Sequence, residues 1–278
     1  MEWFLEPFEL GFQQRALLGG VLAALMASTV GTWLVLRGMS FFGDAFVHGV
    51  VPGVAAAVVL DINPLLGAAV AAAVMVVAIE LVQRKTVLGE DTSIGLLFVG
   101  MLALGVVIIS RMDSYSGSLT SILFGDALGV TAEDIVGQLV VLGVVLTVSL
   151  LLYRPLVALS LSRDKAELLG MRPGLAHAAL LVLIALAVIG SYQSVGTLLV
   201  FGLLVGPPAT ASLVTSTIRS MMIAAGAIGV FSVWVGLVLS YHWGIAASAT
   251  MALVPIVIFF AVLAGQSVFR AAKSPVPA

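Results

Sequence analysis

The chain has 278 residues, of which 61% are hydrophobic and only 9% are charged, and its formal net charge at pH 7 is −2. A soluble domain carries about 25% charged residues, so this composition excludes a globule facing water and predicts a polytopic protein embedded in the lipid bilayer. The small net charge gives no sign of a nucleic-acid partner. The absence of cysteine excludes disulfides, thiolate metal sites and cysteine nucleophiles.

Apolar runs long enough to cross a bilayer recur along the whole sequence, bounded by charged residues, glycine or proline. They predict an all-α fold with about nine transmembrane helices in a single membrane domain over residues 1–278. Eight or ten spans are also compatible with the sequence, because residues 119–128 form a further short apolar piece. The predicted spans are residues 14–36, 41–60, 65–83, 93–110, 133–153, 174–190, 195–214, 218–240 and 244–268.

Basic residues predict the orientation, since loops rich in Lys and Arg stay in the cytoplasm. With the N-terminus outside and the C-terminus inside, only Arg15 and Arg111 of the 12 Lys and Arg residues fall on the outer side. Glutamates stand near the start of the chain, where a signal peptide would be basic. We therefore expect residues 2–12 to form an uncleaved interfacial segment whose aromatic side chains lie at the outer surface.

Asp44 and His48 are the clearest candidates for a functional site, because placing an ionisable group within a span costs free energy and such groups usually have a function. They are four residues apart, so they project from one face of a helix. A carboxylate oxygen and an imidazole nitrogen make half of a metal site that Zn, Mn or Fe accepts. The structural alternative is that Asp44 caps the helix start while His48 bonds a neighbouring carbonyl.

Prolines mark two places where a helix is expected to kink or break. Pro52 stands among glycines just after His48, which is typical of a helix that lines a pathway and equally of close helix packing. Pro207 and Pro208 lie inside the predicted span 195–214, where they remove two backbone donors. Transporters use broken helices around their pathways, although a static kink would serve packing alone.

Residues 155–173 form the one sizeable polar segment on the inner side. Within it, residues 164–170 predict a short amphipathic helix ended by Gly170. Such a helix can dock a soluble partner, and a solvated connector is the alternative. His177 and His242 are expected to be structural. The sequence contains no Walker-type loop, Gly-x-Ser-x-Gly elbow or His-Glu-x-x-His motif, so we expect no enzymatic activity in this chain.

Four stretches, taken in order, carry a family resemblance. Residues 36–53 read LRGMSFFGDAFVHGVVPG, residues 123–125 read LFG, residues 164–170 read DKAELLG, and residues 195–200 read VGTLLV and continue to PPATA at 207–211. Together they resemble the permease subunits of manganese/zinc/iron ABC importers over nearly the whole chain. The departures are Gly38, where the family often has a second basic residue, and Val47, where it often has serine.

The resemblance implies a type II ABC importer-like permease in a prokaryotic plasma (inner) membrane, working as a homodimer with cytoplasmic ATPase subunits and an extracellular or periplasmic metal-binding protein. It implies a transported divalent ion, Mn, Zn or Fe, as cargo and no tightly bound cofactor. The implied metal ligands are Asp44 and His48. The implied coupling segment is about residues 162–170, with Asp164, Ala166, Glu167 and Gly170.

Two other classes remain open from the residues alone. A proton-coupled secondary transporter would use Asp44 and His48 as a proton relay and would need no ATPase. A non-transporting membrane scaffold would show neither metal dependence nor flux. The coupling-like segment favours the ABC importer over both.

Overall fold

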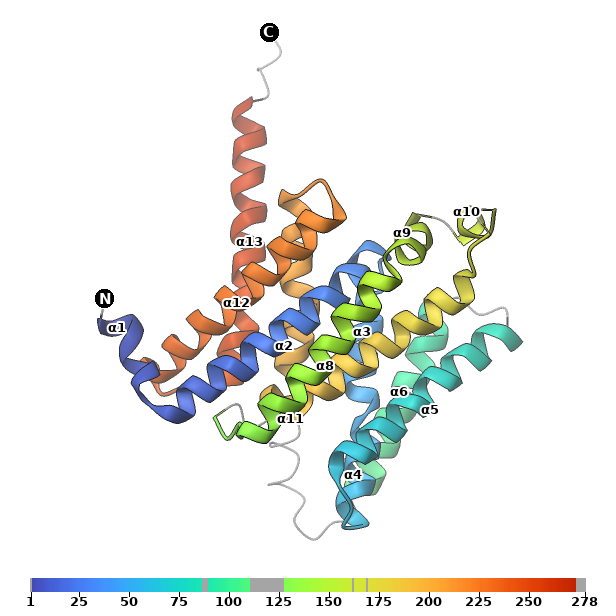
Figure 1. Cartoon of the computed structure of the whole chain (residues 1–278), viewed down its shortest axis with the longest axis horizontal. Coiled ribbons are helices and arrows are strands. Elements are labelled where there is room, and N and C mark those ends of the chain that lie inside the picture. Colours follow the sequence, from blue (N-terminus) through green and yellow to red (C-terminus); the bar gives the residue numbers. More distant parts are fainter. Residues whose placement is uncertain (1, 87–89, 111–127, 162, 169, 274–278) are drawn as a thin grey trace.

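The computed structural model describes residues 2–86, 90–110, 128–161, 163–168 and 170–273, and every regular element within these ranges is a helix (Figure 1). Two short elements open the chain, α1 (Glu2–Leu5) and the 3-10 helix η1 (Glu6–Glu9). The helices that follow are α2 (Gly11–Leu36), α3 (Ser40–Gly49), α4 (Val51–Val59), α5 (Pro64–Lys85), α6 (Glu90–Ile109), α8 (Ala132–Leu151), α9 (Tyr153–Leu161), α10 (Arg163–Leu168), α11 (Pro173–Val214), α12 (Ile218–Trp243) and α13 (Ala247–Lys273).

Among the described residues, eight helical stretches are long and apolar enough to cross a membrane, α3 and α4 counting together as one. The second half of α11, Leu199–Val214, is a shorter apolar helix at the position of the predicted seventh span. The all-α membrane fold expected from composition is therefore confirmed, with a number of spans inside the predicted range. The additional apolar piece, together with the Leu-Phe-Gly at 123–125, lies outside the described residues apart from Leu128.

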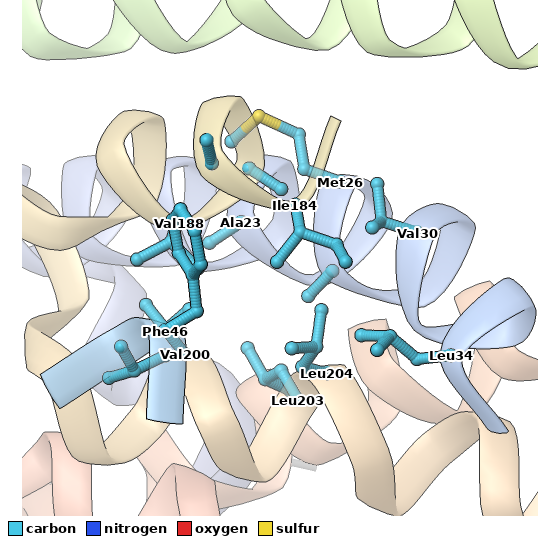
Figure 2. Close-up of a cluster of buried hydrophobic side chains, with 14 of the residues drawn as sticks. Ala23, Met26, Val30, Leu34, Phe46, Ile184, Val188, Val200, Leu203 and Leu204 are labelled. Atoms are coloured by element: carbon cyan, nitrogen blue, oxygen red, sulfur yellow. The ribbon is translucent and has the colours of Figure 1, made fainter. Parts of the chain in front are cut away.

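The largest core cluster is built around α2, which packs against α8, α11 and α12. Figure 2 shows its centre, where side chains of α2, α3 and α11 interlock. Water does not drive helices together inside a bilayer, so this packing depends on close fit and on small residues at the crossings. The labelled members are Ala23, Met26, Val30 and Leu34 of α2, Phe46 of α3, and Ile184, Val188, Val200, Leu203 and Leu204 of α11.

The helices α2 and α11 approach each other closely at Gly31. A Cβ atom on Gly31 would overlap the carbonyl oxygen of Leu204 and would lie 3.1 Å from Cγ of Pro208. The helical partner of the Leu204 carbonyl would be the N–H of residue 208, which proline lacks. The freed carbonyl thus faces the bare backbone of Gly31, where a Cα–H···O contact can partly satisfy it.

The sequence predicted a kink or a break at Pro207 and Pro208, and no break occurs there, because both residues lie inside the continuous second half of α11. The interruption of α11 falls instead at Gly196, whose dihedral angles are φ 71° and ψ 166°. This region of backbone space is essentially restricted to glycine. A proline pair is tolerated in the helix because the neighbouring α2 covers one freed carbonyl.

The predicted span 41–60 is divided into α3 and α4, which meet at Val50. Pro52 occupies one of the first two positions of α4, where its missing N–H leaves no helical bond unmade. The expectation that Pro52 interrupts this helix is consistent with this division. The backbones of Gly53 in α4 and Gly67 in α5 lie against each other, which brings the two helices into direct contact.

Helix ends follow local sequence signals. Thr131 forms a capping box with Asp134 at the start of α8. Gly38, with φ 68°, ends α2 in a Schellman turn closed by the bonds Met39 N to Leu34 O and Gly38 N to Val35 O. Because this turn uses only three residues between α2 and α3, it fixes the direction in which α3 starts.

Candidate functional site

Asp44 and His48 lie on the one face of α3 that is not buried. Every other residue from Phe42 to Gly49 is packed against neighbouring helices, whereas Phe41, Asp44 and His48 form a partly exposed stripe at helical spacing. The side chains of His48 and Asp44 are 25% and 29% exposed, respectively. The sequence prediction that both residues share a face is confirmed.

Glycines hold the back of α3 close to its neighbours. A Cβ atom on Gly43 would lie 2.7 Å from Cδ2 of Leu204 in α11, and one on Gly49 would overlap the sulfur of Met75 in α5. Leu204 is therefore enclosed by Gly31 on one side and Gly43 on the other. This packing leaves little freedom for α3 to rotate and thus orients the Asp44–His48 face.

The pair itself is loosely joined. Nε2 of His48 lies 3.4 Å from Oδ1 of Asp44, longer than the ~2.7–2.9 Å of a strong charge-assisted hydrogen bond. Two ligands that each lie about 2.1 Å from one ion in a tetrahedral shell are separated by about 3.4 Å. The spacing therefore suits two ligands of a single ion as well as it suits a weak ion pair.

The surroundings of the pair are aromatic and supply no further ligand. The ring of Phe98 in α6 lies 6.1 Å from the imidazole of His48 and 5.9 Å from the ring of Phe41. Across the described ranges, no group of three or more His, Cys, Asp or Glu side chains is placed to hold a metal. One copy of the described chain thus offers two ligands and an open side.

The predicted coupling segment forms two short helices, α9 and α10, at the end of the bundle opposite the α4–α5 turn (Figure 1). Ala166 is buried against the bundle, while Glu167 and Gly170 are exposed. Gly170, with φ 71°, ends α10 through bonds from Gly170 N to Glu167 O and from Met171 N to Ala166 O, as predicted. The backbone of Asp164 belongs to α10, and its side chain lies outside the described part of the structure.

Two exposed leucines in this segment were missed by the sequence reasoning. Leu161 at the end of α9 is 77% exposed, and Leu168 at the end of α10 is 87% exposed. Neither leucine belongs to one of the candidate membrane spans among the described residues, so both are candidates for a contact surface. The signal was present in the sequence as leucines within an otherwise polar stretch.

A polar cavity of about 320 Å³ lies directly behind α9. At its wall, Nη1 of Arg37 lies 2.8 Å from Nδ1 of His177. A guanidinium can only donate, so Nδ1 of His177 accepts and its proton is on Nε2. This bond joins the α2–α3 turn to the start of α11, and the expectation that His177 is structural agrees with it. The cavity is lined by Leu36, Arg37, Gln83, Leu159, Ser160, Pro173 and His177.

The other histidine, His242, packs against the N-terminal segment. Its ring stacks on Trp3 at 4.1 Å between centroids, and its Nε2 lies 2.7 Å from the Trp3 carbonyl oxygen. Phe4 stacks on Trp234 in the same way at 5.5 Å. The predicted interfacial segment is thus held against the end of α12.

These features define a multi-pass α-helical membrane protein with an acid–histidine pair on a packed intramembrane helix. The profile of the ABC 3 transport family matches residues 9–266. The chain therefore belongs to the ABC 3 transport family, which confirms the resemblance seen in the sequence.

Individual relatives agree with this membership. The chain is 37% identical over 248 residues to the manganese import system permease protein ScaB of Streptococcus parasanguinis, covering 89% of this chain and 88% of that protein. It is 32% identical over 237 residues to the chelated iron transport system membrane protein YfeD of Yersinia pestis, covering 85% and 80% of the two chains. Among solved structures, PsaBC from Streptococcus pneumoniae in complex with Fab is similar, with a TM-score of 0.83 and 31% identity over 93% of this chain and 94% of that chain.

Proposed function

We propose that this protein is the membrane-spanning subunit of an ATP-driven importer for a divalent transition-metal ion. The observation that carries the proposal is the Asp44–His48 pair, held by packed glycines on the exposed face of an intramembrane helix in a member of the ABC 3 transport family. Relatives with manganese and with iron in their names support a metal as cargo. Carboxylate and imidazole ligands serve Mn, Zn and Fe alike.

In this proposal the permease works as a homodimer. Each copy supplies Asp44 and His48, so two copies facing each other give an ion two oxygens and two nitrogens. Such a site is loose enough for release, because conduction needs binding that is favourable yet weak enough to leave. His48 ligates only when its imidazole is neutral, so ion binding competes with protons.

Energy comes from partner subunits. A metal-binding protein delivers the ion at the outer mouth, and cytoplasmic ATPases contact α9 and α10, including Ala166, Glu167 and Gly170. Their motion passes to α11, which follows α10 after a short turn and packs on α3. Gly196 is suited to serve as a hinge in this movement, because its backbone conformation is open to glycine alone. The N-terminus lies outside and the C-terminus in the cytoplasm.

The test is metal uptake by proteoliposomes containing the permease, its ATPase and its binding protein. Asp44→Asn and His48→Gln roughly keep side-chain size and remove the carboxylate charge of one residue and the imidazole nitrogen of the other, leaving weaker amide oxygen ligands. We expect both to reduce uptake of Mn, Zn or Fe by at least about tenfold, the effect of 1.4 kcal/mol, while the complex assembles and hydrolyses ATP. The matched controls Asp61→Asn and His242→Gln change the same residue types away from α3 and should leave uptake unchanged.

Other outcomes would redirect the assignment. Wild-type uptake in both site variants would show that the pair is structural. Uptake that needs no ATPase and collapses with a protonophore would support the proton-coupled secondary transporter.

A further inference from the structure

An open apolar groove lies between α2 and α12. Its volume is about 740 Å³, within the range of ligand pockets. Among its lining side chains, only the indole N–H of Trp234 is polar. We refer to it as the α2–α12 groove, and its lining residues are Leu25, Met222, Ile223, Gly226, Ala227, Val230, Phe231 and Trp234.

The α12 residues of the groove form one stripe with helical spacing, and Arg219 is the first member of that stripe. Arg219 stands three and four residues before Met222 and Ile223, so it lies on the same face one turn nearer the end of the helix. Its side chain is exposed, with the guanidinium carbon 5.7 Å from the centre of the Tyr153 ring. The groove therefore has a cationic mouth on the side of α9 and α10.

The opposite end of the groove is closed by the protein itself. Phe4 of α1 stacks on Trp234, the last groove residue, and Trp3 stacks on His242 beyond it. The N-terminal segment thus covers the outer part of this face with aromatic rings and leaves the part from Met222 to Trp234 open. From Met222 to Trp234 the helix rises by 12 steps of about 1.5 Å, or about 18 Å, close to the ~15 Å that one leaflet contributes to the hydrocarbon core.

From this match of length, polarity and charge, we infer that the α2–α12 groove binds one acyl chain of an anionic phospholipid, whose phosphate lies against Arg219. The lipid belongs to the leaflet on the side of α9 and α10. That this leaflet is the cytoplasmic one rests on the orientation given with the proposed function. The lipid site itself does not rest on that orientation.

The positive charge of Arg219 favours this lipid over a second copy of the chain as the occupant of the α2–α12 groove. Two copies that met through this groove about an axis normal to the membrane would bring their Arg219 side chains to the same depth and close together. Like charges that are poorly hydrated repel each other strongly. A phospholipid phosphate instead neutralises each Arg219.

The test is native mass spectrometry of the full-length permease in detergent, titrated with dioleoyl phosphatidylglycerol or dioleoyl phosphatidylcholine. We expect one tightly held phosphatidylglycerol per chain, preferred over phosphatidylcholine by about fivefold, the effect of one basic side chain on an anionic lipid. Gly226→Leu should weaken this binding at least about tenfold by filling the floor of the groove. Arg219→Gln should keep a bound lipid and lose the preference.

Gly143→Leu is the matched control. Gly143 is an exposed glycine in the middle of α8 with no atom within 4 Å of an added Cβ, whereas the added Cβ at Gly226 would make only an ordinary contact of 3.5 Å with Leu25. Both variants should therefore fold, and only Gly226→Leu should lose the lipid.

Equal lipid binding by the two leucine variants, or an unchanged preference in Arg219→Gln, would overturn the inference. So would a disulfide-linked dimer of Gly226→Cys in native membranes, since the chain has no other cysteine and the link would place a second copy in the groove. None of these readouts uses transport, so their failure would leave the proposed function standing.

Discussion

Gly31→Ala tests whether the contact between α2 and α11 organises the site. The added methyl would overlap the Leu204 carbonyl oxygen and lie 3.1 Å from Cγ of Pro208. A relaxed carbon–oxygen contact is about 3.3–3.6 Å long, so α2 and α11 have to separate by about 1.5 Å at this point. A gap of this size forfeits about half or more of each dispersion contact across the interface, and overpacking costs about 1–3 kcal/mol.

The control for this prediction is Gly143→Ala, which introduces the same residue in an open position of α8. Both changes raise helix propensity by about 1 kcal/mol, so the difference between them isolates the clash. We expect Gly31→Ala to be about 2 kcal/mol less stable than Gly143→Ala, measured as a lower Tm in detergent by intrinsic tryptophan fluorescence.

The same change should also reduce metal uptake, because Leu204 lies between Gly31 and Gly43 and so transmits the shift to α3. If Gly31→Ala matches Gly143→Ala in Tm and in uptake, the close approach of α2 and α11 does not organise the Asp44–His48 site.

Three further changes test other parts of the structure. Gly38→Ala should lower the free energy of unfolding by about 1–2 kcal/mol, because φ at this residue is 68°. Gly174→Ala lies within a helix and should not lower it, so equal Tm values for the two variants would contradict this prediction. Leu168→Asp should weaken binding of the ATPase subunit at least about tenfold and leave the Tm of the permease unchanged, since Leu168 is 87% exposed; an unchanged Kd would refute the docking role. His177→Leu should lower the number of ions imported per ATP, and His177→Asn, which keeps an acceptor near the position of Nδ1, should restore it; an equal loss in both would show that the bond to Arg37 is not needed.

Several features were predictable from the sequence because they depend on composition and local chemistry. Hydropathy alone identified the membrane class and nearly all the spans, since a bilayer admits few structures other than apolar helices. Thr131 and Gly170 were recognised as a cap and a helix end from residue type and position. The shared face of Asp44 and His48 follows from their separation of four residues.

Tertiary structure decided where the helices break and what surrounds the polar residues. Pro207 and Pro208 were expected to kink or break a helix, and the chain does not break there, because Gly31, distant in sequence, lies against the carbonyl that Pro208 leaves without a donor. Gly196 takes the break instead, and nothing in an apolar stretch distinguishes a glycine that turns the backbone from one that permits close packing.

The hydrogen bond between Arg37 and His177 and the α2–α12 groove were likewise decided by tertiary structure. Each depends on the distance between helices far apart in the chain, and an apolar sequence carries little information about which of its faces meet. Sequence by itself therefore determined that this protein is a membrane-embedded helical bundle with an acid–histidine pair, and helix packing decided how that pair is held, what links it to α9 and α10, and which surface is left open to lipid.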